Sequence, residues 1–265
     1  MSHGKVALDL LAQGQADLAS AADVPFVISV LKGEPLAIVA AVVSVPNEMA
    51  VVARRDRGIA APHDLQGKRV GVTFGTNGEY FLWAFLIRHK LAPDSVTLVD
   101  TPPGKMAQAL ETGTIDAVST WEPVRSEAHV ALGDNARSFT GPDAYTATQV
   151  VIGRNEFLAA HPAATQKLVR ALLKAEAFNR SEPQQALALV ADRLKLDAGA
   201  LVASGWPDFD LNVDLRQSQL VTLEDEARWA MARGYAGKGP VPNFLAHLYL
   251  EALLVVQPER VTVVH

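Results

Sequence analysis

Residues 64–78 read DLQGKRVGVTFGTNG, and the rest of the chain can be interpreted outward from this stretch. Valines alternate with other residues within 69–74, which predicts a short β-strand. A glycine-rich turn follows, and Thr76 and Glu79 have the spacing of a capping box, so we expect a helix from about Asn77. Such a turn presents backbone N–H groups and the positive end of a helix dipole. The stretch therefore predicts either a site for a small polar or anionic ligand or an ordinary turn between strand and helix.

The composition is that of a globular protein with no sign of nucleic-acid binding. The 265 residues, 49% hydrophobic and 20% charged, are enough for one large domain or two lobes. The 24 basic and 29 acidic residues give a net charge of −5, which argues against a nucleic-acid partner. With no cysteine, disulfides and thiol nucleophiles are excluded. We interpret residues 5–13 as an amphipathic helix rather than a signal peptide, and no apolar run reaches the roughly 20 residues of a membrane span.

Strand and helix patterns alternate over the first part of the chain. Strands are expected at 16–21, 36–45, 49–54, 69–74, 96–99, 116–120 and 148–153. Helices are expected between them at 5–13, 22–32, 79–90, 105–111 and 122–132, and then in series at 156–159, 162–179, 183–194, 198–204, 220–233 and 243–254. This order predicts an α/β protein with mainly parallel sheets and a helical carboxyl-terminal region.

Common catalytic and metal-binding patterns are missing from the sequence. The seven histidines are widely spaced and form no H-x-x-x-H or H-E-x-x-H motif. There is no G-x-S-x-G nucleophile motif, and residues 71–78 match neither G-x-G-x-x-G nor a phosphate-binding loop. The carboxylates Glu111, Asp116 and Glu122 are close in sequence, but carboxylates near strand ends usually cap helices or lie on the surface. We therefore expect no catalytic residue, metal or cofactor.

Several short motifs, taken in order, resemble one protein family. They are QGQAD at 13–17, DLQGKRVGV at 64–72, LETGTIDA at 110–117 and WEP at 121–123. Together they resemble the type II periplasmic substrate-binding proteins of ABC importers, in the branch for nitrate, sulfonates, taurine and thiamine-pyrimidine precursors. The unit of a helix, Gly-x-x-Asp and a strand occurs at 8–20 and again at 107–120, as in a protein with two similar lobes.

This resemblance implies two α/β lobes joined by two crossing strands, with a small-molecule solute held in the cleft between the lobes. The first lobe would comprise residues 1–65 and 148–265, and the second residues 66–147. The crossings would fall near 49–57 and 144–150. The implied partner is an ABC transporter permease, and the implied location is the periplasm or a membrane anchor outside the cytoplasm.

The ends of the strands supply the candidate ligand contacts, because ligands in this architecture meet carboxyl ends of strands and amino ends of helices. The candidates that follow the early strands are Ser20, Ala21, Asp23, Ser44 and Asn47. The later candidates are Gly75, Thr76, Asn77, Tyr80, Trp121, Glu122 and Tyr145. Each has a structural alternative, such as helix capping or a place in the core. The aromatic rings and hydroxyls, with no Arg or Lys in these turns, favour a ligand with an apolar or aromatic body and a polar end.

The sequence departs from the family at its start. Family members open with a strand, a turn and a helix before the helix expected here at Lys5. Either the chain is truncated or the strands come from another chain, and exposed strand edges then favour a homodimer. Two other functions stay open. One is a ligand-sensing domain of a signalling system. The other is a thiamine-pyrimidine biosynthesis enzyme of the same fold, against which the lack of cysteine argues because those enzymes have a cysteine-rich segment.

Overall fold

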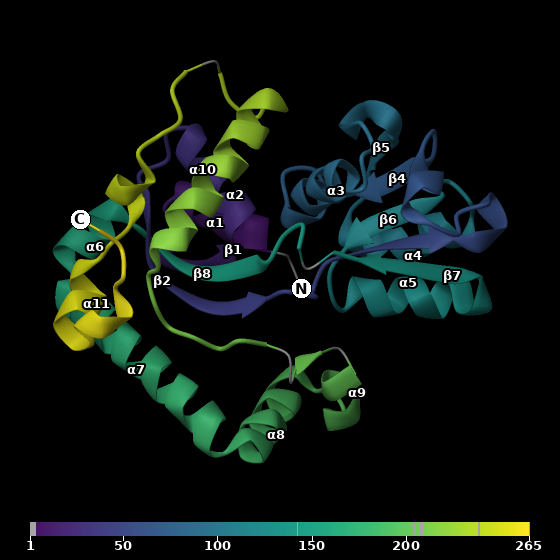
Figure 1. Cartoon of the computed structure of the whole chain (residues 1–265). Helices are drawn as coiled ribbons and strands as arrows, with labels where there is room; N and C mark the ends of the chain where they lie inside the picture. Colours follow the sequence, from purple (N-terminus) through teal and green to yellow (C-terminus); the bar gives the residue numbers. More distant parts are fainter. Residues whose placement is uncertain (1–3, 142, 204, 207–208, 238, 265) are drawn as a thin grey trace. The chain divides into compact units, whose positions relative to one another are not determined.

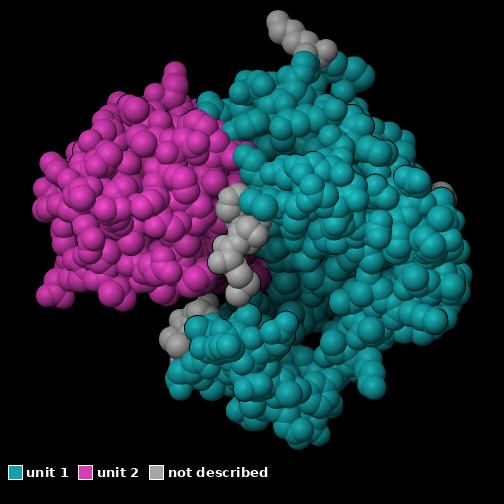
Figure 2. Space-filling view, turned by 180° about the vertical axis from the view of Figure 1, so that it is seen from behind, with its two compact units in different colours: residues 1–44, 148–265 teal, residues 45–147 magenta. Residues whose placement is uncertain are grey.

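The computed structural model describes residues 4–141, 143–203, 205–206, 209–237 and 239–264. The chain divides into two compact units (Figure 1; Figure 2): unit 1 comprises residues 1–44 and 148–265, and unit 2 comprises residues 45–147. Residues 45–65, which we expected in the first lobe, fall in unit 2 because strand β3 (Ala50–Arg54) is hydrogen-bonded within the sheet of that unit. Among the described residues, no helix is both long enough and apolar enough to cross a membrane.

Unit 1 contains a three-stranded sheet in the order β1–β8–β2. The strands are β1 (Leu18–Ala22), β8 (Ala147–Arg154) and β2 (Leu36–Val45). β1 runs antiparallel to β8, and its partners extend from Gly153 to Gln149. The first six residues of β2 are buried. On its outer side, β2 forms isolated antiparallel bridges with Asp210 and Asp214, so one edge of the sheet is partly covered and β1 forms the other edge.

Helices make up most of the remainder of unit 1. They are α1 (Gly4–Ala12), α2 (Asp23–Leu31), α6 (Asn155–Ala160), α7 (Pro162–Ser181), α8 (Pro183–Leu194), α9 (Ala198–Ala203), α10 (Gln217–Ala232) and α11 (Glu251–Val256). The core side chains Phe26, Ile38 and Phe244 are fully buried in one cluster. The helix expected at 243–254 is instead a 3-10 turn, Phe244–His247, followed by α11.

Unit 2 contains a five-stranded sheet in the order β5–β4–β6–β3–β7. The strands other than β3 are β4 (Arg69–Val72), β5 (Thr97–Asp100), β6 (Ala117–Thr120) and β7 (Ala136–Thr140). β4 is parallel to β5 and β6, whereas β3 is antiparallel to β6 and β7. The α/β class is confirmed, and this sheet mixes the two directions where we expected mainly parallel strands. Because β4, β5 and β6 are parallel, their carboxyl ends lie at one edge of the sheet.

In the described part of unit 2, three α-helices lie between the strands. α3 (Asn77–Arg88) follows β4, α4 (Met106–Glu111) lies between β5 and β6, and α5 (Val124–Leu132) follows β6. α4 and α5 share a buried cluster with β3 and β6 that includes Met106, Val118 and Val124. This packing fixes β6, so the position of its carboxyl end is set by the core of unit 2.

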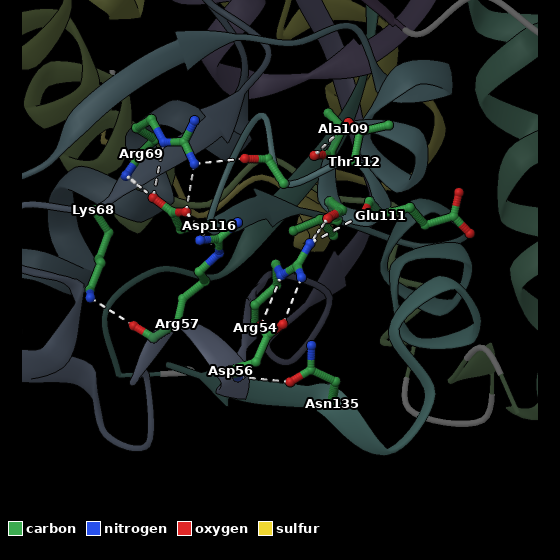
Figure 3. Close-up of polar contacts among 12 residues, drawn as sticks. Arg54, Asp56, Arg57, Lys68, Arg69, Ala109, Glu111, Thr112, Asp116 and Asn135 are labelled. Carbon is green, nitrogen blue, oxygen red and sulfur yellow. Dashed lines mark hydrogen bonds and ion pairs between the residues drawn. The ribbon is translucent and has the colours of Figure 1, made fainter.

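A network of arginine contacts joins residues 54–69 of unit 2 to residues 110–116 (Figure 3). Arg69 donates to the Asp116 carboxylate (2.8 Å) and to the carbonyl oxygen of Gly113 (2.7 Å). Arg54 forms an ion pair with Asp56 at 2.7 Å. Burial acts to raise the pKa of Asp116, but the hydrogen bonds and charge of Arg69 outweigh it, and the pKa lies below its ordinary value. These contacts therefore hold the start of β4 against the loop that follows α4.

Candidate functional site

The turn from β4 into α3 forms where the sequence predicts, but through other hydrogen bonds. α3 begins at Asn77, and Gly75 has a φ of +72°, which glycine adopts without strain. The Thr76 hydroxyl donates to the carbonyl oxygen of Thr73 (2.7 Å), and the Glu79 carboxylate accepts from the Gly75 N–H (2.9 Å). The predicted capping box is therefore wrong in detail, since the Thr76 side chain makes no capping hydrogen bond.

The first turn of α3 lies directly against the end of β6. The Ser119 hydroxyl donates to the carbonyl oxygen of Gly78 at 2.7 Å. A Cβ added at Gly78 would lie 2.9 Å from the Ser119 carbonyl oxygen and 3.3 Å from the ring of Trp121. This close approach requires glycine. It also places the half-buried indole of Trp121 beside the start of the helix.

Aromatic side chains continue this surface along α3. The rings of Tyr80 and Tyr145 meet edge to face, with centroids 5.2 Å apart, and Tyr80 stacks on Trp83 at 5.7 Å. The Asn77 amide donates to the Tyr145 hydroxyl. Tyr80 and Tyr145 are both largely buried. Thus the structure brings together Asn77, Tyr80 and Tyr145, which the sequence predicted as contacts, and it adds Trp83, which the sequence analysis missed.

Glu122 and Asn47 have structural contacts of their own. The Glu122 carboxylate forms an ion pair with Arg125 at 2.7 Å and accepts from the hydroxyl (2.7 Å) and the backbone N–H (3.1 Å) of Ser126. It therefore caps the first turn of α5. Arg125 in turn donates to the carbonyl oxygen of Asn47 at 2.7 Å. These contacts favour the structural alternative for Glu122, whereas the Asn47 side chain is exposed and its role stays a prediction.

The candidate ligand contacts of unit 1 differ from one another in their environments. Ser20 on β1 is exposed, whereas Ala21 and Asp23 are 1% and 3% exposed. The backbone N–H of Ser44 is bonded to Asp210 in an antiparallel bridge. The Asp23 carboxylate faces Glu226 of α10, which is completely buried. Burial and then the charge of Asp23 raise the pKa of Glu226 well above its ordinary value.

Within unit 2, six predicted residues therefore surround the start of α3. They are Gly75, Thr76, Asn77, Tyr80, Trp121 and Tyr145. We name this group the α3 surface; Trp121 is its half-buried member, and the other five residues are buried. The sequence analysis missed Trp83 and Ser119. Trp83 could have been found from its spacing of three residues from Tyr80 on a helix. Among the residues that the structure describes, no group of three or more His, Cys, Asp or Glu side chains could hold a metal ion.

Two curated relatives are similar to part of this sequence. A protein of Brucella abortus that is named only as a binding protein is 30% identical over 150 residues, which is 54% of this chain and 46% of that protein. The taurine-binding periplasmic protein of Escherichia coli is 24% identical over 171 residues, 63% of this chain and 52% of that protein. The chain thus spans about half the length of these curated relatives.

Solved structures extend the likeness to the fold. The periplasmic aliphatic sulphonate binding protein SsuA from Escherichia coli superposes with a TM-score of 0.79 at 20% identity, covering 94% of this chain and 80% of that one. The expectation of a periplasmic-binding-protein fold is confirmed. Residues 2–186 match the family described as NMT1/THI5 like, which is more than half of the sequence. The chain therefore belongs to the NMT1/THI5-like family.

Proposed function

We propose that the chain is a solute-binding protein that captures a small organic sulfonate for an ABC importer. The names of the sulfonate- and taurine-binding relatives support both the binding role and the ligand class. The observation that carries the proposal is the close approach of the Trp121 ring to Gly78, in the first turn of α3.

The α3 surface suits both parts of an organic sulfonate. Sulfonate oxygens are hydrogen-bond acceptors with a negative charge, which the start of an α-helix favours through its N–H groups and dipole. The organic part would contact the half-buried ring of Trp121, behind which Tyr80 and Tyr145 pack edge to face. In unit 1, contacts from Ser20, Ala21, Asp23 and Ser44 stay a prediction, and Ser20 has the most accessible side chain of these.

The direct test is calorimetry with taurine, ethanesulfonate and benzenesulfonate, with the matching carboxylates as competitors. We expect at least one sulfonate to bind and to raise the melting temperature, because a ligand specific to the folded state stabilises it. Trp121→Ala should weaken binding by about 1–3 kcal/mol, the range for a lost aromatic contact. Trp206→Ala in unit 1 is the control and should bind like the parent chain. If no sulfonate binds, or if both variants bind equally well, the proposal fails.

We also propose that the chain acts by binding alone and works outside the cytoplasm. The named relatives are binding proteins, and two are named as periplasmic. A sensing role in place of import would use the same α3 surface but a different partner. Co-purification with a membrane permease, compared with co-purification with a membrane kinase, separates the two. Conversion of a bound sulfonate, followed by NMR, would contradict the binding-only role.

A homodimer is a further part of this proposal. β1 is the edge strand of the unit 1 sheet, and its five residues, LASAA, carry no charge that would discourage pairing. Val6 and Leu10, one helical turn apart on the contacting helix α1, are 37% and 39% exposed. Light scattering at micromolar concentration tests the dimer. We expect Ser20→Pro, which removes an N–H from β1, to shift it towards monomer, and a stable monomer of the parent chain would refute it.

A further inference from the structure

Unit 1 contains a cavity of about 290 Å³ that is separate from the α3 surface. Its walls come from the end of β2, the second half of α7, the middle of α8, and Trp206, Leu211 and Val213. Val43, Phe178, Val190 and Trp206 are among the side chains that line it. All of these elements belong to unit 1, so the cavity is a feature of this unit alone.

The lining is almost entirely apolar. Apart from the indole N–H of Trp206, two side chains among its described residues are polar. One is Glu176, whose carboxylate already accepts hydrogen bonds from Arg180 and Arg260 (2.7 Å each) and from the Val213 N–H (2.8 Å). The other is Asn179, which is half-buried; in the described part of the chain, no hydrogen bond engages its amide. The cavity therefore offers one amide to a ligand and no cation, since both arginines are paired with Glu176.

We propose that this cavity binds a small uncharged molecule with an aromatic or branched aliphatic body and one hydrogen-bonding group. The volume is at the lower end of the roughly 300–1,000 Å³ of ligand pockets. A sulfonate is a poor occupant, because burying its charge without a cationic partner is costly. Apolar cavities lined by Leu, Ile and Phe are known to bind apolar molecules of the size of benzene. This site thus differs from the α3 surface in the class of its ligand.

Features of the lining support a site open to ligands rather than a sealed packing defect. Leu189 on α8 lines the cavity and is 61% exposed, so an apolar entrance reaches solvent. Trp206 forms a flat wall and is itself held by the ring of Phe209, with centroids 5.7 Å apart. A flat apolar wall next to one amide is the usual arrangement of small-molecule pockets.

The test uses N-phenyl-1-naphthylamine, a neutral apolar fluorophore with a single N–H group. We expect its emission to rise on titration with the full chain, and excess taurine should leave it unchanged. Ala175 and Ala171 lie one turn apart on α7 and are both exposed, but only Ala175 lines the cavity. Ala175→Phe should weaken the probe at least tenfold, while Ala171→Phe should change it less than twofold.

A second variant guards against an effect on folding. Leu189→Glu puts a charge at the entrance on an exposed position and should also weaken the probe at least tenfold, with a native circular dichroism spectrum. Failure of the parent chain to bind the probe would overturn the proposal. It would also be overturned if either cavity variant bound like the parent chain, or if taurine displaced the probe.

Discussion

The buried carboxylate of Glu176 allows a quantitative prediction for unit 1. Its side chain is 3% exposed and lies on α7. One oxygen accepts from Arg260 and Arg180, and the other accepts from the Val213 N–H. We predict that Glu176→Gln destabilises the chain markedly, because it removes the charge that these donors share.

The size of the loss follows from the exposure of each partner. The Arg180 side chain is 68% exposed, so its pair contributes less than about 1 kcal/mol. The Arg260 side chain is 21% exposed, so breaking its ion pair with Glu176 should cost less than the roughly 3–5 kcal/mol of a fully buried pair. A hydrogen bond to a charged group contributes about 1.5–3 kcal/mol, and glutamine keeps only one accepting oxygen for three donors. We therefore expect a loss of about 2–4 kcal/mol in the free energy of unfolding.

Urea unfolding followed by circular dichroism measures this loss. Arg180→Ala is the matched control, since it removes the exposed partner of the same carboxylate and should cost less than about 1 kcal/mol. The slope against urea should stay the same in both variants if only stability changes. A loss below about 0.5 kcal/mol for Glu176→Gln, or equal losses for the two variants, would refute the reasoning.

Three more outcomes are expected. Gly78→Ala should lower the melting temperature and the affinity for a sulfonate together, because the new Cβ would lie 2.9 Å from the Ser119 carbonyl oxygen; a native melting temperature would contradict this. Glu226→Gln should raise the free energy of unfolding at pH 7 but not at pH 4. The reason is that the raised pKa of Glu226 favours the folded state at low pH, and this stabilisation is lost as the pH rises through the folded pKa. Equal effects of the substitution at both pH values would argue against this reasoning. Asp116→Asn should destabilise at pH 7, with the difference fading as the pH falls through the lowered pKa that Arg69 maintains; urea titrations from pH 2 to pH 7 check the sign.

Elements with strong local signals could be predicted from the sequence. The strand predicted at 36–45 has the observed bounds of β2, because an unbroken run of eight apolar residues, 36–43, places most of the strand in the core. The helix predicted at 183–194 has the bounds of α8, since proline in the first turn fixes its start. The start of α3 at Asn77 is confirmed for a similar local reason, the glycine turn before it.

Elements whose form depends on distant partners could not be predicted in this way. The sequence gives no sign of β7, ARSFT, because it alternates weakly and forms a strand only where β3 supplies hydrogen bonds. Strand direction is equally non-local, and the antiparallel pairing of β3 with β6 joins segments more than 60 residues apart. The division of the chain near residue 45 depends on the same pairing, because β3 is placed by its neighbours rather than by its own composition.

The candidate site shows the same limit at the level of single side chains. Glu122 follows a strand end just as Trp121 does, and the sequence ranks them alike, yet Arg125 and Ser126 occupy the carboxylate of Glu122. A polar side chain that is already engaged gains little from a ligand, because it exchanges one partner for another. The half-buried ring of Trp121 has no such competition, so it can add contacts without breaking hydrogen bonds. Ligand specificity at the α3 surface should therefore depend more on the shape of the organic group than on the polar side chains that the sequence makes conspicuous.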